Sequence, residues 1–321
     1  MSPGSGGRAA TFEFEGCTLA YTDYGSGNQA VILIHGQLLS RFMHGPLAES
    51  LAEQGHRVIT MDLLGHGESD RPPDMWRYSM TQFAEQVVGL MDHLGLDKAV
   101  VGGTSLGANV GLEFGATAPE RARGLLVEMP VLDQGVYGAV MAFTPLMTML
   151  QYGAPAVRAA GFLARLVPRS ILPFLGNVIL DTIRQDHAAS PAILQGMFLG
   201  RIAPHRSLRR KFDMPVLVIG HHSDPIHPFV DAEMLASELP NARLIEATSI
   251  LEMRLHPERL TEEMGRFLDE CWSDPKMAGR GRVKAVSGQP VKRTGQNARR
   301  RVSRRRRPAP ASPARAASRR G

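Results

Sequence analysis

Short runs of aliphatic residues alternate with amphipathic helical patterns along most of the chain. The runs are AVILIHG, HRVITMDLLG, KAVVGGTS, RGLLVEMP, MPVLVIGHH and ARLIEAT, and the segments between them include SMTQFAEQVVGLMDHLGL and DAEMLASELP. Continuous Val, Ile and Leu runs between such helices are typical of parallel strands that are buried on both faces. The alternation therefore predicts an α/β fold with a mostly parallel central sheet and helices on both of its faces.

Two stretches depart from this alternation. Near the start, TFEFEG and TLAYTDYG follow each other through a tight turn at Gly16, which predicts an antiparallel edge to the sheet. Between Pro130 and His205 the strand signals stop, and the chain is rich in Met, Ala and Leu and interrupted by prolines. We interpret this stretch as an inserted helical cap, not as a continuation of the sheet.

The net charge of +6 is an average over two unlike regions. Residues 274–321 hold 16 of the 37 Lys and Arg residues but one of the 31 acids, and they contain no aromatic residue. Such a segment cannot bury enough apolar surface to offset its ordering entropy, so we expect a disordered tail that could bind nucleic acid or another anionic surface. A solvated extension without a partner is the simpler alternative. The predicted organisation is a flexible N-terminus at 1–10, a core at 11–129 and 206–273, a cap at 130–205 and the tail at 274–321.

The remaining composition favours a cytoplasmic protein. Cys17 and Cys271 lie far apart without metal-ligand spacing, so we expect buried thiols in a reducing compartment. The N-terminus has no apolar stretch typical of a secretory signal. The most apolar helical run, GAVMAFTPLMTML, is broken by Pro145 and is too short to span a bilayer.

The strongest local motif is Gly103-Thr104-Ser105-Leu106-Gly107, which lies between a buried strand and a helix start. It fits G-x-S-x-G, in which the serine sits on a strained turn and the flanking glycines avoid collisions across the bend. The helix N-terminus places unpaired N–H groups and a partial positive charge beside the serine oxygen. In this context Ser105 is a candidate nucleophile, and a glycine-rich packing turn is the alternative.

With these motifs the chain resembles the α/β-hydrolase fold superfamily over about residues 11–273, and the helical insertion resembles the cap of that family. VILIHGQLLS resembles the family's His-Gly turn, and the resemblance implies an oxyanion hole made by the backbone N–H groups of Gln37 and Leu106. MDLLGHGESDRP resembles a family loop in which His66 is expected to pack and not to catalyse. MPVLVIGHHSDPIHP resembles the element that carries the family's acid, which implies that role for Asp224.

The catalytic base is the point at which the chain departs from the family. Relatives carry a Gly-His pair just after the last strand, and in this chain Ser249 and Ile250 stand there. The histidine of the segment is His256, which aligns with a solvent-side position at the start of the last helix. Serine acyl transfer needs a base, an orienting acid and oxyanion donors together. We take His256 as the candidate base and expect the loop to be rearranged so that it reaches Ser105.

Two further possibilities are consistent with the sequence. Another residue could replace the base, because His221, His222 and His227 flank Asp224 and Glu128 ends the strand after the nucleophile helix. The scaffold could instead have lost its chemistry and serve as a binding protein for a small apolar ligand or a partner.

The cap bears on the class of ligand. It is Met-rich and apolar, and one face of a cap covers the pocket, so an acyl or alkyl group is favoured over a sugar or a phosphorylated metabolite. We expect the charged cap residues, Arg158, Arg165, Arg169, Asp181 and Arg184, to be solvated. No ligand spacing for a metal and no phosphate-binding signature is present in the sequence, so no cofactor is implied. The sequence thus predicts an esterase-like serine hydrolase with Ser105, Asp224 and His256 as its catalytic residues.

Overall fold

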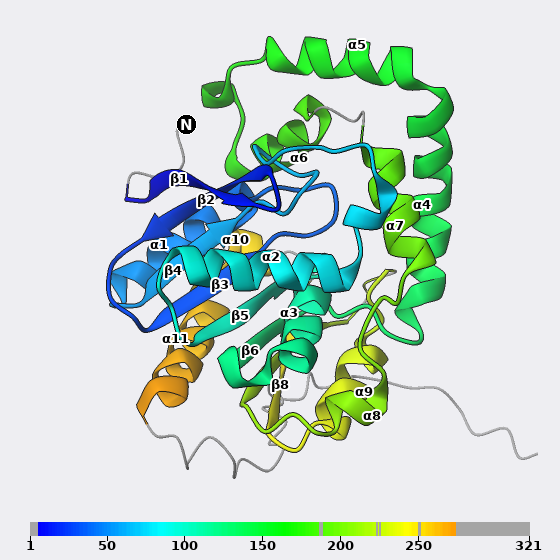
Figure 1. The fold of residues 1–321 in the computed structure, drawn as a ribbon. Coiled ribbons are helices and arrows are strands. Elements are labelled where there is room, and N and C mark those ends of the chain that lie inside the picture. The colour runs from blue at the N-terminus through cyan, green and yellow to red at the C-terminus, as the bar shows by residue number, and fades with distance from the viewer. Residues whose placement is uncertain (1–5, 186–188, 223, 225, 250–251, 274–321) are drawn as a thin grey trace, which may run out of the picture. The chain divides into compact units, whose positions relative to one another are not determined.

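The computed structural model of the protein describes residues 6–273 apart from 186–188, 223, 225 and 250–251. The described strands are β1 (Arg8–Phe14), β2 (Cys17–Tyr24), β3 (Ala30–Ile34), β4 (Arg57–Met61), β5 (Ala99–Thr104), β6 (Ala122–Glu128), β7 (Val216–His221) and β8 (Ala242–Ala247). They form one eight-stranded sheet in the order β1-β2-β4-β3-β5-β6-β7-β8 (Figure 1). The predicted α/β class with a mostly parallel sheet is confirmed.

The antiparallel edge predicted at the start of the chain is present. β1 pairs with β2 and β2 pairs with β4 in antiparallel register, and every other pair in the sheet is parallel. β1 begins at Arg8, which pairs with Asp23, so residues 8–10 belong to a strand and not to a flexible N-terminus. Most side chains of β1 are exposed, and backbone pairing with β2 holds this strand in place.

The helices follow the predicted alternation. The described helices are α1 (Gly45–Glu53), α2 (Met80–His93), α3 (Leu106–Thr117), α4 (Gly135–Tyr152), α5 (Ala154–Arg165), α6 (Phe174–Arg184), α7 (Ser190–Leu199), α8 (Arg206–Arg209), α9 (Phe229–Glu238), α10 (Glu252–Leu255) and α11 (Glu258–Ser273), with short 3-10 turns η1 (Arg41–His44), η2 (Met75–Arg77), η3 (Pro119–Arg121) and η4 (Arg169–Ile171). Helices α4 to α7 all lie between β6 and β7, in the segment predicted to form the cap.

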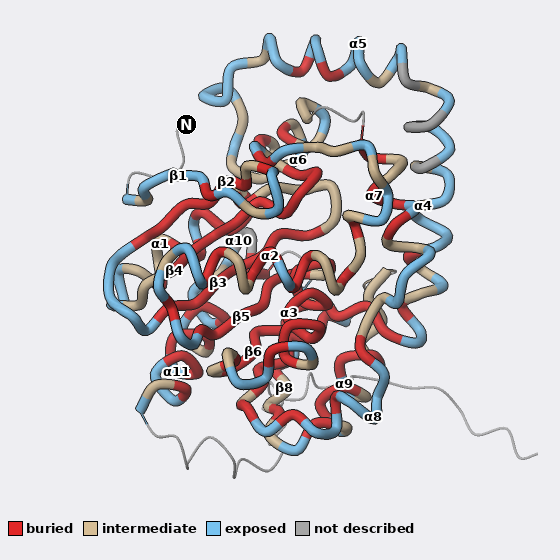
Figure 2. The backbone as a smooth tube through the Cα atoms, viewed as in Figure 1, coloured by how far each residue is buried: buried red, intermediate tan, exposed pale blue. Residues whose placement is uncertain are grey.

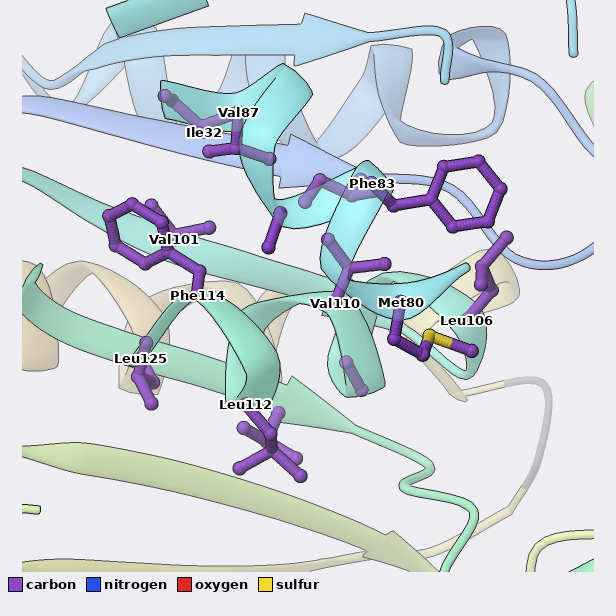
Figure 3. Packing of buried hydrophobic residues seen from close by; sticks show 14 of the residues in the cluster. Ile32, Met80, Phe83, Val87, Val101, Leu106, Val110, Leu112, Phe114 and Leu125 are labelled. Atoms are coloured by element: carbon purple, nitrogen blue, oxygen red, sulfur yellow. The ribbon is translucent and has the colours of Figure 1, made fainter. Parts of the chain in front are cut away.

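The sheet is buried on both faces by separate apolar clusters. In β3, Ile32 and Ile34 belong to one cluster, whereas Val31 and Leu33 belong to the other. Side chains of α2, α3 and α9 fill the first cluster, and side chains of α1 and α11 fill the second. Figure 3 shows part of the first cluster, in which side chains of α2 and α3, including Phe83 and Phe114, pack together with side chains of the sheet. This two-sided burial explains why the strands appear in the sequence as continuous aliphatic runs.

Two buried polar side chains attach the cap segment to the core. The Asn109 carboxamide on α3 donates to the carbonyls of Val131 and Ile202, on either side of the cap helices, and accepts the Val131 N–H. The Asp231 carboxylate on α9 accepts N–H groups at the start of α4, including those of Leu132 and Gly135. Both side chains are at most 1% exposed. The ends of the cap segment are therefore fixed by hydrogen bonds that the core supplies.

One expectation about the charged cap residues is wrong. Asp181 is not solvated: it is buried and forms ion pairs with Arg169 and Arg184, the second of which is itself partly buried. The pairing lets a carboxylate enter the interface between cap helices, because a buried charge needs a partner. Arg158 and Arg165 are exposed, as predicted.

The thiols agree with the prediction, whereas the expected break at Pro145 is absent: α4 runs from Gly135 through Pro145 to Tyr152 as one helix. Cys17 and Cys271 are both free and buried, as predicted. Within the described residues no helix is long and apolar enough to cross a membrane. The basic tail at 274–321 and Ile250 lie outside the described residues.

Candidate active site

Ser105 lies on a sharp bend between β5 and α3. Its φ of 56° and ψ of −107° are unusual for a residue with a side chain, so the bend holds strained backbone beside the hydroxyl. The bend packs against β3 so closely that a Cβ atom at Gly103 or Gly107 would lie 1.9 or 2.1 Å from the Ile34 carbonyl oxygen. The Ser105 N–H donates to the Glu128 carbonyl at 2.9 Å, which ties the bend to β6. The two glycines of the motif are thus required by contact with the neighbouring strand.

A histidine contacts the serine hydroxyl, and that histidine is His227. Its Nε2 lies 2.8 Å from Ser105 Oγ, and its Nδ1 lies 2.8 Å from Asp224 Oδ2. When Nδ1–H donates to the carboxylate, Nε2 is the acceptor for the serine hydroxyl. The side chains of His227 and Asp224 are 13% and 8% exposed. The serine hydroxyl, the imidazole and the carboxylate therefore form one continuous hydrogen-bonded chain.

The loop that follows β7 supplies both the acid and this histidine. Asp224 Oδ1 accepts the backbone N–H groups of Ile226 and His227, at 2.8 and 3.0 Å. Burial by itself would raise the pKa of the Asp224 carboxyl, but hydrogen bonds from the His227 side chain and from the backbone of His227 and Ile226 lower that pKa overall. The carboxylate is thus kept ionised, and it fixes the backbone that carries the imidazole.

The predicted base lies elsewhere. His256 is exposed in the turn between α10 and α11, and its backbone N–H donates to the Glu252 carbonyl. The position in contact with Ser105 is taken by His227, one of the histidines that flank Asp224 in the sequence. The signal that could have selected it is its spacing, because a residue three positions after an aspartate can be held by that carboxylate within one turn.

The remaining candidates near Asp224 have separate environments. His222 lies at the surface, where it pairs with Glu246 at 2.9 Å. His221 is buried, with Nε2 3.4 Å from Glu128 Oε1 and Nδ1 2.9 Å from the Ser249 carbonyl oxygen. Glu128 also accepts the Thr104 hydroxyl. Glu128 and His221 thus support the bend from β6 and β7, whereas His227 contacts the serine hydroxyl.

The predicted oxyanion donors border the same space as the nucleophile. Leu106 is the first residue of α3, where a helix has no partner of its own for the N–H, and Gln37 follows the His-Gly turn after β3. Within the described part of the chain neither N–H donates to another residue. Gln37, Ser105 and Leu106 all line one cavity. Two unused backbone donors at the nucleophile are what stabilisation of an oxyanion requires.

That cavity is small and apolar, with a volume of about 40 Å³. The helices of the cap segment contribute about half of its lining. Its lining residues are Gln37, Met80, Ser105, Leu106, Asn109, Val131, Ala139, Phe143, Leu194, Met197, Phe198 and Ile202. A volume so far below the 300–1,000 Å³ of drug-sized sites favours a short apolar group.

The polar groups at the cavity are of the kinds that covalent catalysis needs. They are the Ser105 hydroxyl, to which the His227 imidazole is hydrogen-bonded, and the backbone N–H groups of Gln37 and Leu106. Among the described residues no group of three or more His, Cys, Asp or Glu side chains is arranged to hold a metal ion. The set that is present can perform acyl transfer with the chain's own atoms.

Comparisons with known proteins agree with this geometry at the level of fold. Residues 29–167 match the family model described as alpha/beta hydrolase fold. The chain is 36% identical over 107 residues to a 2-hydroxymuconate semialdehyde hydrolase of Pseudomonas putida, and the match covers 33% of this chain and 37% of the relative. It is 34% identical over 110 residues to bifunctional epoxide hydrolase 2 of Sus scrofa, covering 34% and 20%. Each match therefore spans well under half of the relative's length.

Solved structures resemble more of the chain. A hydrolase from Pseudomonas aeruginosa PA01 superposes with a TM-score of 0.65 at 20% identity, covering 81% of this chain and 98% of that one. This coverage is larger than that of the segment matched by the family model. The similarity supports a common fold, and the matched family model identifies which one.

Proposed function

The chain belongs to the α/β-hydrolase fold superfamily, and we propose that it is a serine hydrolase that cleaves an ester or a similar carbonyl compound with a small apolar acyl portion. The observation that carries the proposal is the 2.8 Å contact between Ser105 Oγ and His227 Nε2, continued by the 2.8 Å contact between His227 Nδ1 and Asp224 Oδ2. A nucleophile, a base and an orienting acid in this order are the requirement for serine acyl transfer.

In the proposed reaction, Ser105 Oγ attacks the substrate carbonyl while His227 Nε2 accepts the hydroxyl proton. The negative charge that develops on the carbonyl oxygen is stabilised by the N–H groups of Gln37 and Leu106. His227 then gives its proton to the leaving alkoxide as the C–O bond breaks, which leaves an ester on Ser105. A water molecule, deprotonated by His227, attacks this ester and releases the acid and the free serine. Asp224 remains ionised throughout and stabilises the imidazolium.

His227 takes the role that the sequence assigned to His256. Its side chain is mostly buried and is held between Ser105 and Asp224, whereas His256 is exposed. The proposed base and its acid then belong to one loop after β7. The mechanism therefore needs no histidine in the loop after β8. This arrangement accounts for the Ile250 that stands where relatives carry their base.

The cavity supports a compact apolar acyl group as the substrate portion next to Ser105. The side chains that line it are apolar apart from those of Gln37, Ser105 and Asn109. The Asn109 carboxamide is already engaged with Val131 and Ile202. A charged or sugar-like acyl group would enter this cavity without compensating hydrogen bonds, at a cost of about 1–3 kcal/mol for each buried polar group.

The proposal is tested by labelling the purified full-length chain with a fluorophosphonate probe, which reacts with an activated serine. We expect labelling of the wild type and of Thr117→Ala, which removes a hydroxyl from the end of α3. We expect no labelling of Ser105→Ala, with an unchanged melting temperature. If wild type is not labelled, does not hydrolyse p-nitrophenyl acetate and still binds an apolar ligand tightly, the proposal fails and the chain is a binding protein.

A further inference from the structure

Helix α5 carries its large apolar side chains on the outside. Phe162, Leu163 and Leu166 are 62%, 62% and 64% exposed. With Ala159 they recur at helical spacing of three and four residues, so they form one stripe. Figure 2 colours most of α5 as exposed. We call these four residues the outer α5 face.

The inner face of α5 is made of small residues. Gly161 and Ala164 are buried, and a Cβ atom at Gly161 would lie 3.1 Å from the Ile183 carbonyl oxygen of α6. Guanidinium groups join the two helices, because Arg165 donates to the Arg184 carbonyl and Arg184 donates to the Ala164 carbonyl. Helix α5 is therefore held to α6 by close backbone contact and by these hydrogen bonds. Its larger apolar side chains take no part in this packing and remain exposed. In a soluble helix the apolar face is directed inward, so this reversal marks an interaction surface.

The charges around the outer α5 face are positive. Residues 135–184, which span α4 to α6, contain four arginines and one acid, Asp181. That acid is buried in ion pairs with Arg169 and Arg184. Arg158 and Arg165 are exposed on α5 itself, and helical geometry places both on the same side of the apolar stripe. Within the described residues of these helices no acidic group is left to meet a cationic partner.

This charge pattern decides among the possible occupants. The C-terminal segment 274–321 carries a large excess of Arg and Lys, so it would be repelled. A second copy would bring the same arginines of both chains together without acids between them. An anionic phospholipid surface fits both features: its acyl chains accept the apolar stripe, and its headgroups accept the arginines at the edge of the stripe.

We propose that α5 is a peripheral membrane anchor that lies in the surface of an anionic phospholipid bilayer. Phe162, Leu163 and Leu166 enter the boundary between headgroups and acyl chains. Arg158 contacts the phosphates, and Arg165, whose Nε and Nη2 donate to the Arg184 carbonyl, adds positive charge at the same edge. Twelve residues are too few to span the hydrocarbon core, so the helix lies along the surface. Helix α4 also carries large exposed apolar residues, among them Met141 at 77% and Tyr152 at 83%. Such anchoring does not depend on the proposed hydrolysis.

The test is flotation of the full-length chain with vesicles of phosphatidylglycerol and phosphatidylcholine in equal parts, at 0.1 and 0.5 M NaCl. High salt suppresses binding that is purely electrostatic, including binding by the basic segment. We expect wild type to retain part of its binding at 0.5 M NaCl and to bind phosphatidylcholine alone more weakly than it binds the mixed vesicles at 0.1 M NaCl. Phe162→Ser with Leu166→Ser should lower the partition coefficient about 100-fold, about tenfold for each side chain removed from the lipid. Val230→Ser, at an exposed position of α9, should bind as wild type does.

A second measurement keeps the test independent of the stability of the double variant. Cys17 and Cys271 are buried, so a cysteine at Phe162→Cys can be labelled selectively with an environment-sensitive fluorophore. Its emission should shift to shorter wavelength with the anionic vesicles, and that of labelled Val230→Cys should not. Two results overturn the proposal: unchanged flotation of the double variant at 0.5 M NaCl together with no emission shift, or a wild-type dimer in light scattering that the double variant abolishes.

Discussion

At the level of single residues, the Asp224 carboxylate makes two kinds of hydrogen bond. It accepts the His227 ring and also the backbone N–H groups that shape the loop. The sequence identified Ser105 and Asp224 as candidates because each lies in a local pattern of strand and turn. It did not single out His227, because the contact with Ser105 joins residues 122 positions apart. Such a contact follows from the tertiary arrangement of β5 and β7, which a local sequence pattern does not predict.

The charge of Asp224 is predicted to be needed for turnover. Asp224→Asn keeps the shape of the side chain but removes the charge that stabilises the imidazolium of His227. In a well-studied serine protease the corresponding change lowers kcat about 10⁴-fold, and we expect a loss of about 10³- to 10⁴-fold here. Steady-state hydrolysis of p-nitrophenyl acetate measures it. Asp133→Asn, an exposed acid, is the control, and equal activity of both variants contradicts the assignment.

Two buried histidines predict a decline of stability in mild acid. His35 accepts the Leu63 N–H through Nε2, and its ring lies 4.7 Å from that of His66. Burial lowers the pKa of His35 and lowers that of His66 well below its usual value, with the charge of His35 adding to the second shift. The pKa values of both histidines are lower in the folded state than the unfolded value of about 6.5. At a pH between the folded and the unfolded pKa values, the unfolded state therefore binds more protons than the folded state. The free energy of unfolding should therefore be greatest above pH 6.5 and fall as the pH is lowered below it.

Urea unfolding at pH 7.5, 6.5 and 5.5 measures this effect. His66→Gln should show a smaller fall between pH 7.5 and 5.5 than wild type, whatever its stability at pH 7.5. His256→Gln changes an exposed histidine and should leave the fall unchanged. The same pH dependence in His66→Gln and wild type contradicts the prediction.

Among the elements, the strands were predictable and the details of the cap were not. Strands β3 to β8 coincide with aliphatic runs in the sequence because the sheet is covered on both faces. The start of β1 was missed because its side chains are mostly exposed and leave no apolar signal. Asp181 was expected in solvent because sequence gives no information on which arginines meet it across the cap.

The hydrogen bonds of Asn109 predict how firmly the cap segment is held. Asn109→Ala leaves two carbonyl groups and the Val131 N–H without partners in a buried place. We expect a loss of about 2–3 kcal/mol in the free energy of unfolding, since each unsatisfied buried group costs about 1–3 kcal/mol and relaxation recovers part. Chemical denaturation gives the value. Asn241→Ala removes a hydrogen bond at the surface and should cost less than about 1 kcal/mol; equal losses in both variants refute the anchoring role.

In the molecule as a whole, the core supplies the candidate catalytic residues, and helices between β6 and β7 line the cavity beside them. Ser105, Gln37 and Leu106 come from the core, whereas Ala139, Phe143 and several α7 side chains close the cavity. The family resemblance could be inferred from motifs that lie in the core. The size of the cavity beside Ser105 could not, because it depends on how α4 and α7 pack over this residue.

The small cavity predicts a preference for short acyl groups. Across p-nitrophenyl acetate, butyrate, hexanoate and octanoate, kcat/KM should fall by at least about tenfold from the shortest to the longest ester. Phe143→Ala enlarges the cavity and should move the preference to longer chains. Phe162→Ala removes a phenyl ring from the exposed face of α5 and should leave the profile unchanged. A profile that rises with chain length in the wild type contradicts the size limit.

The decisive question for the proposed mechanism is which imidazole receives the proton of Ser105. The measurement is kcat/KM for p-nitrophenyl acetate in His227→Gln and in His256→Gln, with circular dichroism to confirm folding. Loss of a triad histidine costs on the order of 10⁶ in kcat in a well-studied protease, so we expect His227→Gln to lose at least about 10³-fold and His256→Gln to remain within about twofold of wild type. Activity that survives His227→Gln and disappears in His256→Gln would show that His227 is not the base.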